Sequence, residues 1–255
     1  MTLIPKRIKR GWMNLRVSQV IVETPDTHTF HLVDADEGGC PFDYFAGQYL
    51  TFRFDHLAPK PLVRSYTMSS SPRQEGYAAF TVKRVEKGLV SNWLCDEIKA
   101  GSILKARGPI GKFCYDPALD REHLVMVAGG SGVTPFISIM RQFSDRLGQE
   151  GAPQKMSLLV SYRSVGDIIC KKELESVASH PGNKVLVTLS REQRMDLGYA
   201  FGRITDGMLQ NVFGDDKDRI TMMTCGPLAI MDQAVAYGQK LGLSTEQIKT
   251  ESFES

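Results

Sequence analysis

Short runs in which apolar and polar residues alternate, or in which β-branched residues cluster, fill the first half of the chain. They predict strands at residues 15–24, 29–33, 49–54, 65–68, 78–85 and 102–107. One helix is expected among them, at residues 91–98, because Ser91 carries a side chain suited to capping a helix N-terminus. Short, closely spaced strands separated by turn residues favour a six-stranded antiparallel barrel over a parallel sheet.

The pattern changes after residues 116–122, where apolar strands begin to alternate with helical stretches. Strands are predicted at residues 123–128, 156–162, 184–189 and 219–224, and helices at residues 135–147, 171–179, 205–212 and 228–241. Successive strands start about thirty residues apart, the length of one βαβ unit. The second half therefore predicts a doubly wound parallel sheet, and we expect two domains, at residues 1–116 and 117–255.

Composition narrows the class of protein. The 255 residues are 42% hydrophobic and 24% charged, as in ordinary globular domains, and a net charge of +2 gives no indication of nucleic-acid binding. The five cysteines stand singly, without the spacing of a zinc or iron–sulfur site, so we predict no metal ligands. Because no apolar run is long enough to span a bilayer, we expect a cytoplasmic protein without a transmembrane segment.

A glycine-rich stretch joins the first strand of the second half to its first helix. It reads Gly129-Gly130-Ser131-Gly132-Val133-Thr134-Pro135. Glycines let a backbone approach a ligand closely, and free amides at a helix start attract phosphate. The stretch indicates a dinucleotide loop, and a purely structural glycine turn is the alternative.

Two segments of the first half carry groups that suit a phosphate-bearing aromatic ligand. In Arg64-Ser65-Tyr66-Thr67, a strand would present the arginine and tyrosine on one face and the serine and threonine on the other. In Gly88-Leu89-Val90-Ser91, a helix start near Lys83 could hold a pyrophosphate. Taken alone, each segment also fits a half-buried strand or an ordinary capped helix.

In this order and at these distances, the motifs make the chain resemble the ferredoxin–NADP reductase superfamily. The resemblance runs from about Asn14 to Phe253. It includes residues 108–113, a turn that closes the barrel in this family, and Thr224-Cys225-Gly226-Pro227 after the last main strand. It implies an FAD-binding barrel followed by a nicotinamide-binding domain. It also implies an enzyme that passes hydride from NADPH or NADH to FAD, and electrons onward to an iron–sulfur, haem or similar protein acceptor.

The resemblance further implies roles for individual residues. Arg64 would pair with the FAD pyrophosphate, Tyr66 would stack on the flavin and Thr67 would bond its N5 atom. The rest of the FAD would meet Ser65, Val82, Lys83, Gly88, Val90 and Ser91. The nicotinamide dinucleotide would meet Gly130, Gly132, Thr134, Pro135, Cys225, Gly226 and Pro227. The residues expected to act in catalysis are Tyr66, Thr67, Cys225 and Phe253, with Phe253 as an aromatic shield over the flavin.

Polar residues after two strands of the second half bear on the choice of nicotinamide. Arg163 follows the second of these strands, and Ser190-Arg191 follows the third. The 2′-phosphate of NADP suits an arginine and a hydroxyl, so NADPH is favoured over NADH. Glu192 meeting a ribose hydroxyl would favour NADH instead.

The end of the chain leaves the electron acceptor open. In some members of the family, an ending like Thr250-Glu251-Ser252-Phe253 continues into a [2Fe–2S] domain, whose four cysteines are absent here. The acceptor is therefore either a separate ferredoxin, oxygenase or haem protein, or a missing C-terminal [2Fe–2S] domain. Two other functions stay open: a flavin reductase that releases reduced flavin, and a non-catalytic flavin-binding electron-coupling module.

Overall fold

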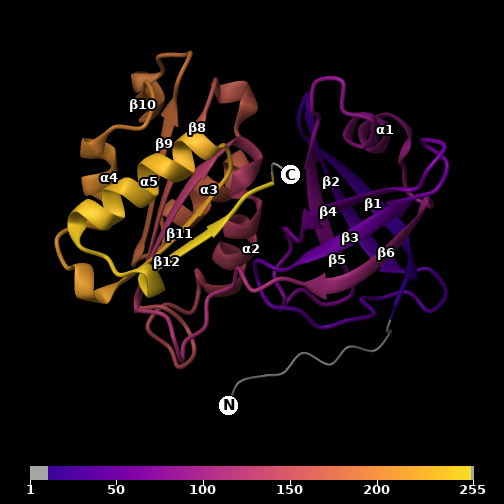
Figure 1. Cartoon of the computed structure of the whole chain (residues 1–255), viewed down its shortest axis with the longest axis horizontal. Helices are drawn as coiled ribbons and strands as arrows, with labels where there is room; N and C mark the ends of the chain where they lie inside the picture. The colour runs from indigo at the N-terminus through magenta and orange to yellow at the C-terminus, as the bar shows by residue number, and fades with distance from the viewer. Residues whose placement is uncertain (1–10, 254–255) are drawn as a thin grey trace.

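The computed structural model describes residues 11–253 and contains two sheets, one from each half of the chain (Figure 1). The first sheet has the order β4-β3-β6-β1-β2-β5, and all its pairings are antiparallel. A bridge between Met68 and Phe80 joins the β4 end of this order to the β5 end, so the sheet closes into the predicted barrel. Its elements are β1 (Met13–Thr24), β2 (Thr27–Asp34), β3 (Tyr49–Phe54), β4 (Leu62–Thr67), β5 (Ala78–Lys83), α1 (Leu89–Glu97) and β6 (Ile103–Ile110).

Aromatic rings fill the barrel. The ring centroid of Phe80 lies 5.1 Å from that of Phe30 and 4.5 Å from that of Phe52, and all three side chains are fully buried. Tyr66 packs at the edge of this cluster, with its ring centroid 5.9 Å from Phe52 and 5.6 Å from Phe80. Burying each such ring stabilises the fold by about 1.5–3 kcal/mol. Because Tyr66 packs against two of these rings, the core also fixes its position.

The second sheet has the order β10-β9-β8-β7-β11-β12 and is parallel throughout, as predicted. Its strands are β7 (His123–Gly129), β8 (Lys155–Tyr162), β9 (Asn183–Leu189), β10 (Ala200–Phe201), β11 (Ile220–Cys225) and β12 (Ile248–Glu251). Its helices are α2 (Thr134–Phe143), α3 (Lys171–Ala178), α4 (Asp206–Phe213) and α5 (Leu228–Leu241). Short 3₁₀ turns complete it: η1 (Gly130–Val133), η2 (Val165–Asp167), η3 (Met195–Leu197), η4 (Lys217–Arg219) and η5 (Thr245–Gln247).

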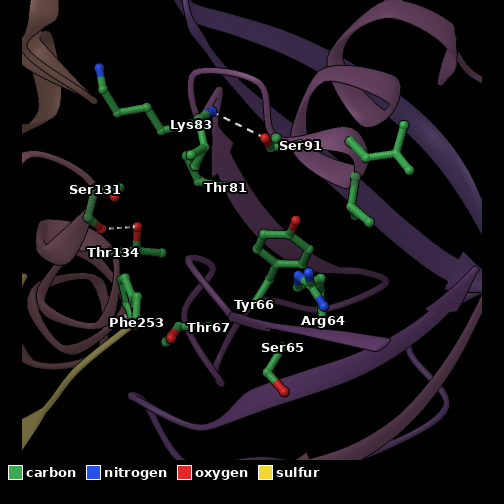
Figure 2. A pocket seen from close by; sticks show the side chains of 14 residues that line it. Arg64, Ser65, Tyr66, Thr67, Thr81, Lys83, Ser91, Ser131, Thr134 and Phe253 are labelled. Atoms are coloured by element: carbon green, nitrogen blue, oxygen red, sulfur yellow. Dashed lines mark hydrogen bonds between the residues drawn. The ribbon is translucent and has the colours of Figure 1, made fainter. Parts of the chain in front are cut away.

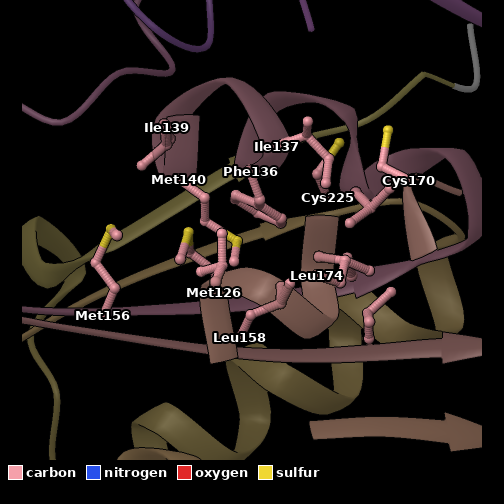
Figure 3. Packing of buried hydrophobic residues seen from close by; sticks show 14 of the residues in the cluster. Met126, Phe136, Ile137, Ile139, Met140, Met156, Leu158, Cys170, Leu174 and Cys225 are labelled. Atoms are coloured by element: carbon pink, nitrogen blue, oxygen red, sulfur yellow. The ribbon is translucent and has the colours of Figure 1, made fainter. Parts of the chain in front are cut away.

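Helices cover both faces of the second sheet, as the doubly wound fold requires. On one face, Met126 and Leu158 pack with Phe136 and Met140 of α2 (Figure 3). On the other face, residues of β7 pack against α4 and α5. Every residue of β7 is buried, so its carboxyl end, where η1 begins, is held firmly in place.

Hydrogen bonds from α2 join the second half to the barrel. The buried Ser138 hydroxyl donates to the Ser70 carbonyl over 2.6 Å, and the Arg141 guanidinium donates to the Ser69 carbonyl over 2.7 Å. Arg73 of the barrel forms an ion pair with Asp145 at 2.9 Å. These contacts fix how the glycine-rich turn faces the barrel.

Several element bounds differ from those predicted. Helix α1 begins at Leu89 instead of residue 91, and Gly88 is its N-cap. Ser91 does not cap the helix, because its Oγ accepts the Val85 amide over 3.0 Å. Strand β6 continues through Ile110, so residues 108–110 belong to a strand and not to a closing turn. Helix α2 ends at Phe143, four residues early, in a series of turns.

Among residues 11–253, no helix is both long and apolar enough to cross a membrane.

Candidate functional site

A cleft of about 280 Å³ opens between the barrel and the turn that follows β7 (Figure 2). This volume is at the low end for ligand clefts, so a dinucleotide would lie partly outside it. The side chains that line the cleft belong to β4, to the β5–α1 segment, to the η1–α2 turn and to the chain end. They are Arg64, Ser65, Tyr66, Thr67, Thr81, Lys83, Val85, Gly88, Leu89, Val90, Ser91, Ser131, Thr134 and Phe253.

Ten of the predicted site residues meet in this cleft, although they come from distant parts of the sequence. Four lining residues were not predicted: Thr81, Val85, Leu89 and Ser131. The other predicted residues do not line it: Val82, Gly130, Gly132, Pro135, Arg163, Ser190, Arg191, Cys225, Gly226 and Pro227.

Strand β4 supplies a cation and an aromatic ring side by side. Figure 2 shows Arg64 and Tyr66 on the same side of the strand, with Ser65 pointing the other way. Ser65 Oγ lies 3.1 Å from Thr51 Oγ1 on β3, while Arg64 is exposed. Burial raises the pKa of Tyr66 above its ordinary value, so its phenol stays neutral and its ring offers a flat apolar surface.

The start of helix α1 forms another wall of the cleft. A Cβ at Gly88 would lie 2.7 Å from Ser91 Oγ and 2.9 Å from Val85 Cβ, so only glycine fits this N-cap. The first amides of a helix have no partner within the helix and carry a partial positive charge. The Gly88 amide donates to the Val85 carbonyl over 2.8 Å, so residues 89–91 offer the main-chain donors to an anion in the cleft.

Lys83 does not reach toward the start of α1. Its Nζ lies 2.7 Å from both carboxylate oxygens of Asp26, and Figure 2 shows the side chain extending away from Arg64 and Ser91. Burial works to raise the pKa of Asp26, but hydrogen bonds from Lys83, Thr24 and Thr27 outweigh it and lower that pKa. The expected contact between Lys83 and the FAD phosphates would thus require this ion pair to open.

Val82 of the same strand does not line the cleft. Its side chain is 1% exposed and packs in the barrel core. Side chains alternate along a strand, so Thr81 and Lys83 face the cleft while Val82 faces inward. The Val82 side chain therefore cannot contact a ligand in the cleft.

One glycine of the glycine-rich turn packs tightly against the backbone of β11, and only two residues of the turn reach the cleft. A Cβ at Gly132 would lie 2.3 Å from the Cys225 carbonyl oxygen, whereas one at Gly130 would meet nothing within 4 Å. The residues of the turn that reach the cleft are Ser131 and Thr134, and the Thr134 hydroxyl donates to the Ser131 carbonyl over 2.7 Å. Pro135 is buried in the first turn of α2.

The segment Cys225-Gly226-Pro227 lies directly behind this turn. Cys225 is fully buried, and this burial raises the pKa of its thiol. The charge of Glu251 raises the same pKa further. Its sulfur is therefore a packing group and not a reactive thiolate. A Cβ at Gly226 would lie 2.8 Å from the Gly129 carbonyl oxygen, so Gly226 also serves close packing.

The end of the chain brings a ring and a carboxyl group to the site. Phe253 is 44% exposed and lines the cleft on the same side as Thr134 (Figure 2). Glu251 on β12 pairs with Cys225 on β11, and burial raises its pKa to about 7. Within residues 11–253, its Oε2 has no hydrogen-bond partner. The sequence drew attention to Phe253 but gave no sign that Glu251 would be buried.

The residues predicted to select the nicotinamide lie together at the carboxyl ends of β8 and β9. The Ser190 amide donates to the Tyr162 carbonyl over 2.8 Å, and the Arg191 amide donates to the Arg163 carbonyl over 2.9 Å. The Arg163 guanidinium is held by Asp167 at 2.6 Å and by Asp26 at 3.3 Å. Carboxyl ends of parallel strands are the usual ligand edge of such sheets.

No group of three or more His, Cys, Asp and Glu side chains within residues 11–253 could hold a metal ion. The cleft itself combines a cation, an aromatic surface, hydroxyls and helix-start amides. Such groups bind and orient a ligand that brings its own reactive atoms.

Two family models match the chain, one in each half. The family model of the oxidoreductase FAD-binding domain matches residues 14–115, and that of the oxidoreductase NAD-binding domain matches residues 126–236. Together the two models match most of the chain, one for each sheet.

Individual relatives match over nearly the whole chain. The glycine betaine monooxygenase reductase subunit of Pseudomonas aeruginosa is 34% identical in an alignment of length 253 that covers 95% of this chain and 65% of the relative. The NADH oxidoreductase HCR of Escherichia coli is 31% identical over 90% of this chain and 65% of its own. The crystal structure of the cytochrome P450 reductase GcoB of Amycolatopsis superposes with a TM-score of 0.79 at 25% identity, over 99% of this chain and 73% of that one. The chain thus spans about 65% of the length of these curated relatives.

With both family models in this order over most of its length, this chain belongs to the oxidoreductases that carry an FAD-binding domain followed by an NAD-binding domain, and its fold is that of a solved ferredoxin NADP+ reductase from Neisseria gonorrhoeae.

Proposed function

We propose that this chain is an FAD-dependent NAD(P)H reductase that passes reducing equivalents through the flavin to an electron-accepting protein. The observation that carries the proposal is the cleft, in which the Tyr66 and Arg64 side chains of the barrel meet Ser131 and Thr134 of the second half. Hydride transfer needs two rings held face to face, and this cleft is where the two halves could present them.

The groups in the cleft fit an FAD molecule. Tyr66 is held by the barrel core and offers a ring for stacking, while Arg64 is exposed and suited to a phosphate. The start of α1 adds main-chain donors close by. FAD would supply the redox chemistry when bound; Tyr66 and Thr67 would orient its ring, and Phe253 would cover the cleft until the nicotinamide enters.

Arg64 gives a direct test of this assignment. Arg64→Ala should weaken FAD binding about 10–100-fold, the cost of losing a hydrogen bond to a charged group. Arg53→Ala is the matched control, because Arg53 lies on the neighbouring strand, is partly exposed and pairs with Asp55 at 2.6 Å outside the cleft. Equal FAD affinity in the two variants, measured by fluorescence titration, would contradict the FAD site.

We propose that NADPH is the preferred nicotinamide. Support comes from the exposed Arg191 beside Ser190 at the carboxyl end of β9. Glu192, which could otherwise meet a ribose, accepts the Val165 amide over 2.8 Å. Arg191→Ala should raise KM for NADPH about tenfold or more and leave KM for NADH unchanged. An equal effect on both nucleotides would remove the preference, and the relative named as an NADH oxidoreductase makes this comparison necessary.

The acceptor is proposed to be an oxygenase, a ferredoxin or a haem protein, or a [2Fe–2S] domain beyond these residues. Support comes from the relative named as the reductase subunit of a monooxygenase. Anaerobic mixing with an isolated [2Fe–2S] ferredoxin and NADPH should reduce the ferredoxin only when the chain is present. Reduction of free flavin but of no iron–sulfur or haem protein would favour the flavin-reductase alternative.

Two further assignments belong to this proposal. We place the FAD-binding domain at residues 1–116 and the nicotinamide-binding domain at residues 117–255, and limited proteolysis should cut first within residues 116–122.

We also place the protein in the cytoplasm, since its five cysteines are free thiols. Recovery of the protein mainly with membranes after cell fractionation would contradict that location.

A further inference from the structure

A line of hydroxyl groups leads away from the cleft along the outside of the barrel. It starts at Thr81 of β5, which lines the cleft. Thr81 Oγ1 lies 2.7 Å from Oγ1 of Thr29, its directly paired residue on β2. The Thr29 hydroxyl in turn donates to Glu23 Oε1 on β1 over 2.9 Å. Three neighbouring strands thus connect the cleft to a carboxylate.

The two inner members of this line are sealed from water, and the last is not. Thr81 is 6% exposed and Thr29 is 2% exposed, whereas Glu23 is partly exposed. Paired threonines on neighbouring strands often bond to each other and stabilise a sheet. Here the threonine pair has a further neighbour at each end. Thr81 lines the cleft, and Thr29 donates to the partly exposed carboxylate of Glu23.

The hydrogen bonds can be arranged in two ways, which differ in where Thr81 donates its single hydroxyl proton. In the first, Thr81 donates to Thr29 in place of Ser69 and Thr29 donates to the ionised Glu23, so the Thr81 oxygen can accept a proton from the cleft. In the second, a protonated Glu23 donates to Thr29, Thr29 donates to Thr81, and Thr81 donates to Ser69 Oγ at 3.0 Å. A proton entering at Thr81 converts the first arrangement into the second and leaves one proton on Glu23.

Charged neighbours from the second half surround the outer end of the line. Cys170 and Arg141 both lie close enough to Glu23 for its charge to act on them. Arg141 is itself paired with Glu173 at 2.5 Å. His31 of the barrel also lies within the field of Glu23 and Arg141.

The proposed reductase must release one proton for each nicotinamide it oxidises. NAD(P)H gives up two electrons and one proton to become NAD(P)⁺ when the electrons leave singly to two one-electron acceptors. We propose that this proton leaves the cleft through Thr81, Thr29 and Glu23. The relay rests on the proposed reductase function, because only that reaction generates the proton inside the cleft.

Thr29→Val tests the relay, with Thr29→Ser as the matched control. Valine keeps the shape of the side chain and removes the hydroxyl, whereas serine keeps the hydroxyl. FAD-loaded protein is reduced with one equivalent of NADPH and reoxidised by ferricyanide in weak buffer containing a pH indicator. Flavin absorbance reports electron loss and the indicator reports proton release, so the two rates are measured separately.

In wild type and Thr29→Ser, proton release should keep pace with flavin oxidation. In Thr29→Val, it should lag behind about tenfold or more, because a positioned proton carrier is lost. Glu23→Gln, a change at a partly exposed side chain, should cause the same lag and provides the test if Thr29→Val does not fold.

The possible failures are distinguishable. A wild-type chain that holds no FAD, or whose flavin NADPH does not reduce, contradicts the reductase function and the relay with it. A functional wild type whose Thr29→Val and Glu23→Gln variants release protons as fast as they lose electrons contradicts the relay alone.

Discussion

Replacing Gly132 with alanine should destabilise the chain more than replacing Gly130, only two residues away. The new Cβ at position 132 would lie 2.3 Å from the Cys225 carbonyl oxygen and 2.6 Å from both the Cys225 carbonyl carbon and the Gly226 Cα. These are main-chain atoms at the end of a fully buried strand, so no side-chain rotation can relieve the overlap. Either η1 or the end of β11 must move by about 1 Å, which places the loss near the upper end of the usual overpacking range, about 3 kcal/mol.

Gly130→Ala is the matched control for this change. Gly130 has a φ of +53°, and its Cβ would meet nothing within 4 Å. Alanine there therefore carries only the cost of a left-handed backbone, about 1 kcal/mol. Urea unfolding of both variants, followed by circular dichroism, measures the difference as a shift in midpoint. Equal losses, or a larger loss for Gly130→Ala, would refute the conclusion that Gly132 serves close packing against β11.

Three further changes test other parts of the structure. Glu251→Gln should gain stability relative to wild type as pH rises from 4.5 to about 7, by up to about 3 kcal/mol. Over this range folded wild type keeps a proton that the unfolded chain has lost, so wild type loses stability, and the difference stays constant above it. A constant difference between pH 4.5 and about 7 would contradict the raised pKa of Glu251. Asp26→Asn and Lys83→Met, made singly and together, should show a coupling of about 1–2 kcal/mol at pH 7. The coupling should be lost as pH falls below 3.8 and through the lowered pKa of Asp26, because protonation of the carboxylate removes the ion pair. Additive losses at pH 7 would show no net ion-pair contribution. Ser138→Ala should cost about 1–2 kcal/mol in thermal unfolding by removing a buried hydrogen bond between the halves, and an unchanged midpoint would show that this bond contributes nothing.

The sequence was sufficient to predict the architecture because its two hydrophobic periods are distinct. Alternation in the first half and buried strands separated by helices in the second half led to the correct sheet types. The glycine-rich turn was placed correctly between β7 and α2. Its spacing did not reveal that Gly132 packs on Cys225, because that contact joins residues far apart in sequence.

The site was harder to predict where pairing between strands decides which side chains meet. Lys83 lies opposite Thr27 in the β2–β5 register, which brings Asp26 within reach of its ammonium group. No local pattern contains that register, so the ion pair could not be foreseen. The inward direction of the Val82 side chain, by contrast, follows from the alternation of side chains along a strand.

The most direct test of the central claim is the visible spectrum of the FAD-loaded chain before and after anaerobic addition of NADPH and, separately, NADH. We expect bound flavin whose absorbance bleaches on mixing, faster with NADPH than with NADH. Faster bleaching with NADH would keep the reductase and overturn the nicotinamide preference. A chain that cannot be loaded with FAD, or whose bound flavin neither nucleotide reduces, would contradict the claim that this cleft passes hydride from a nicotinamide to a flavin.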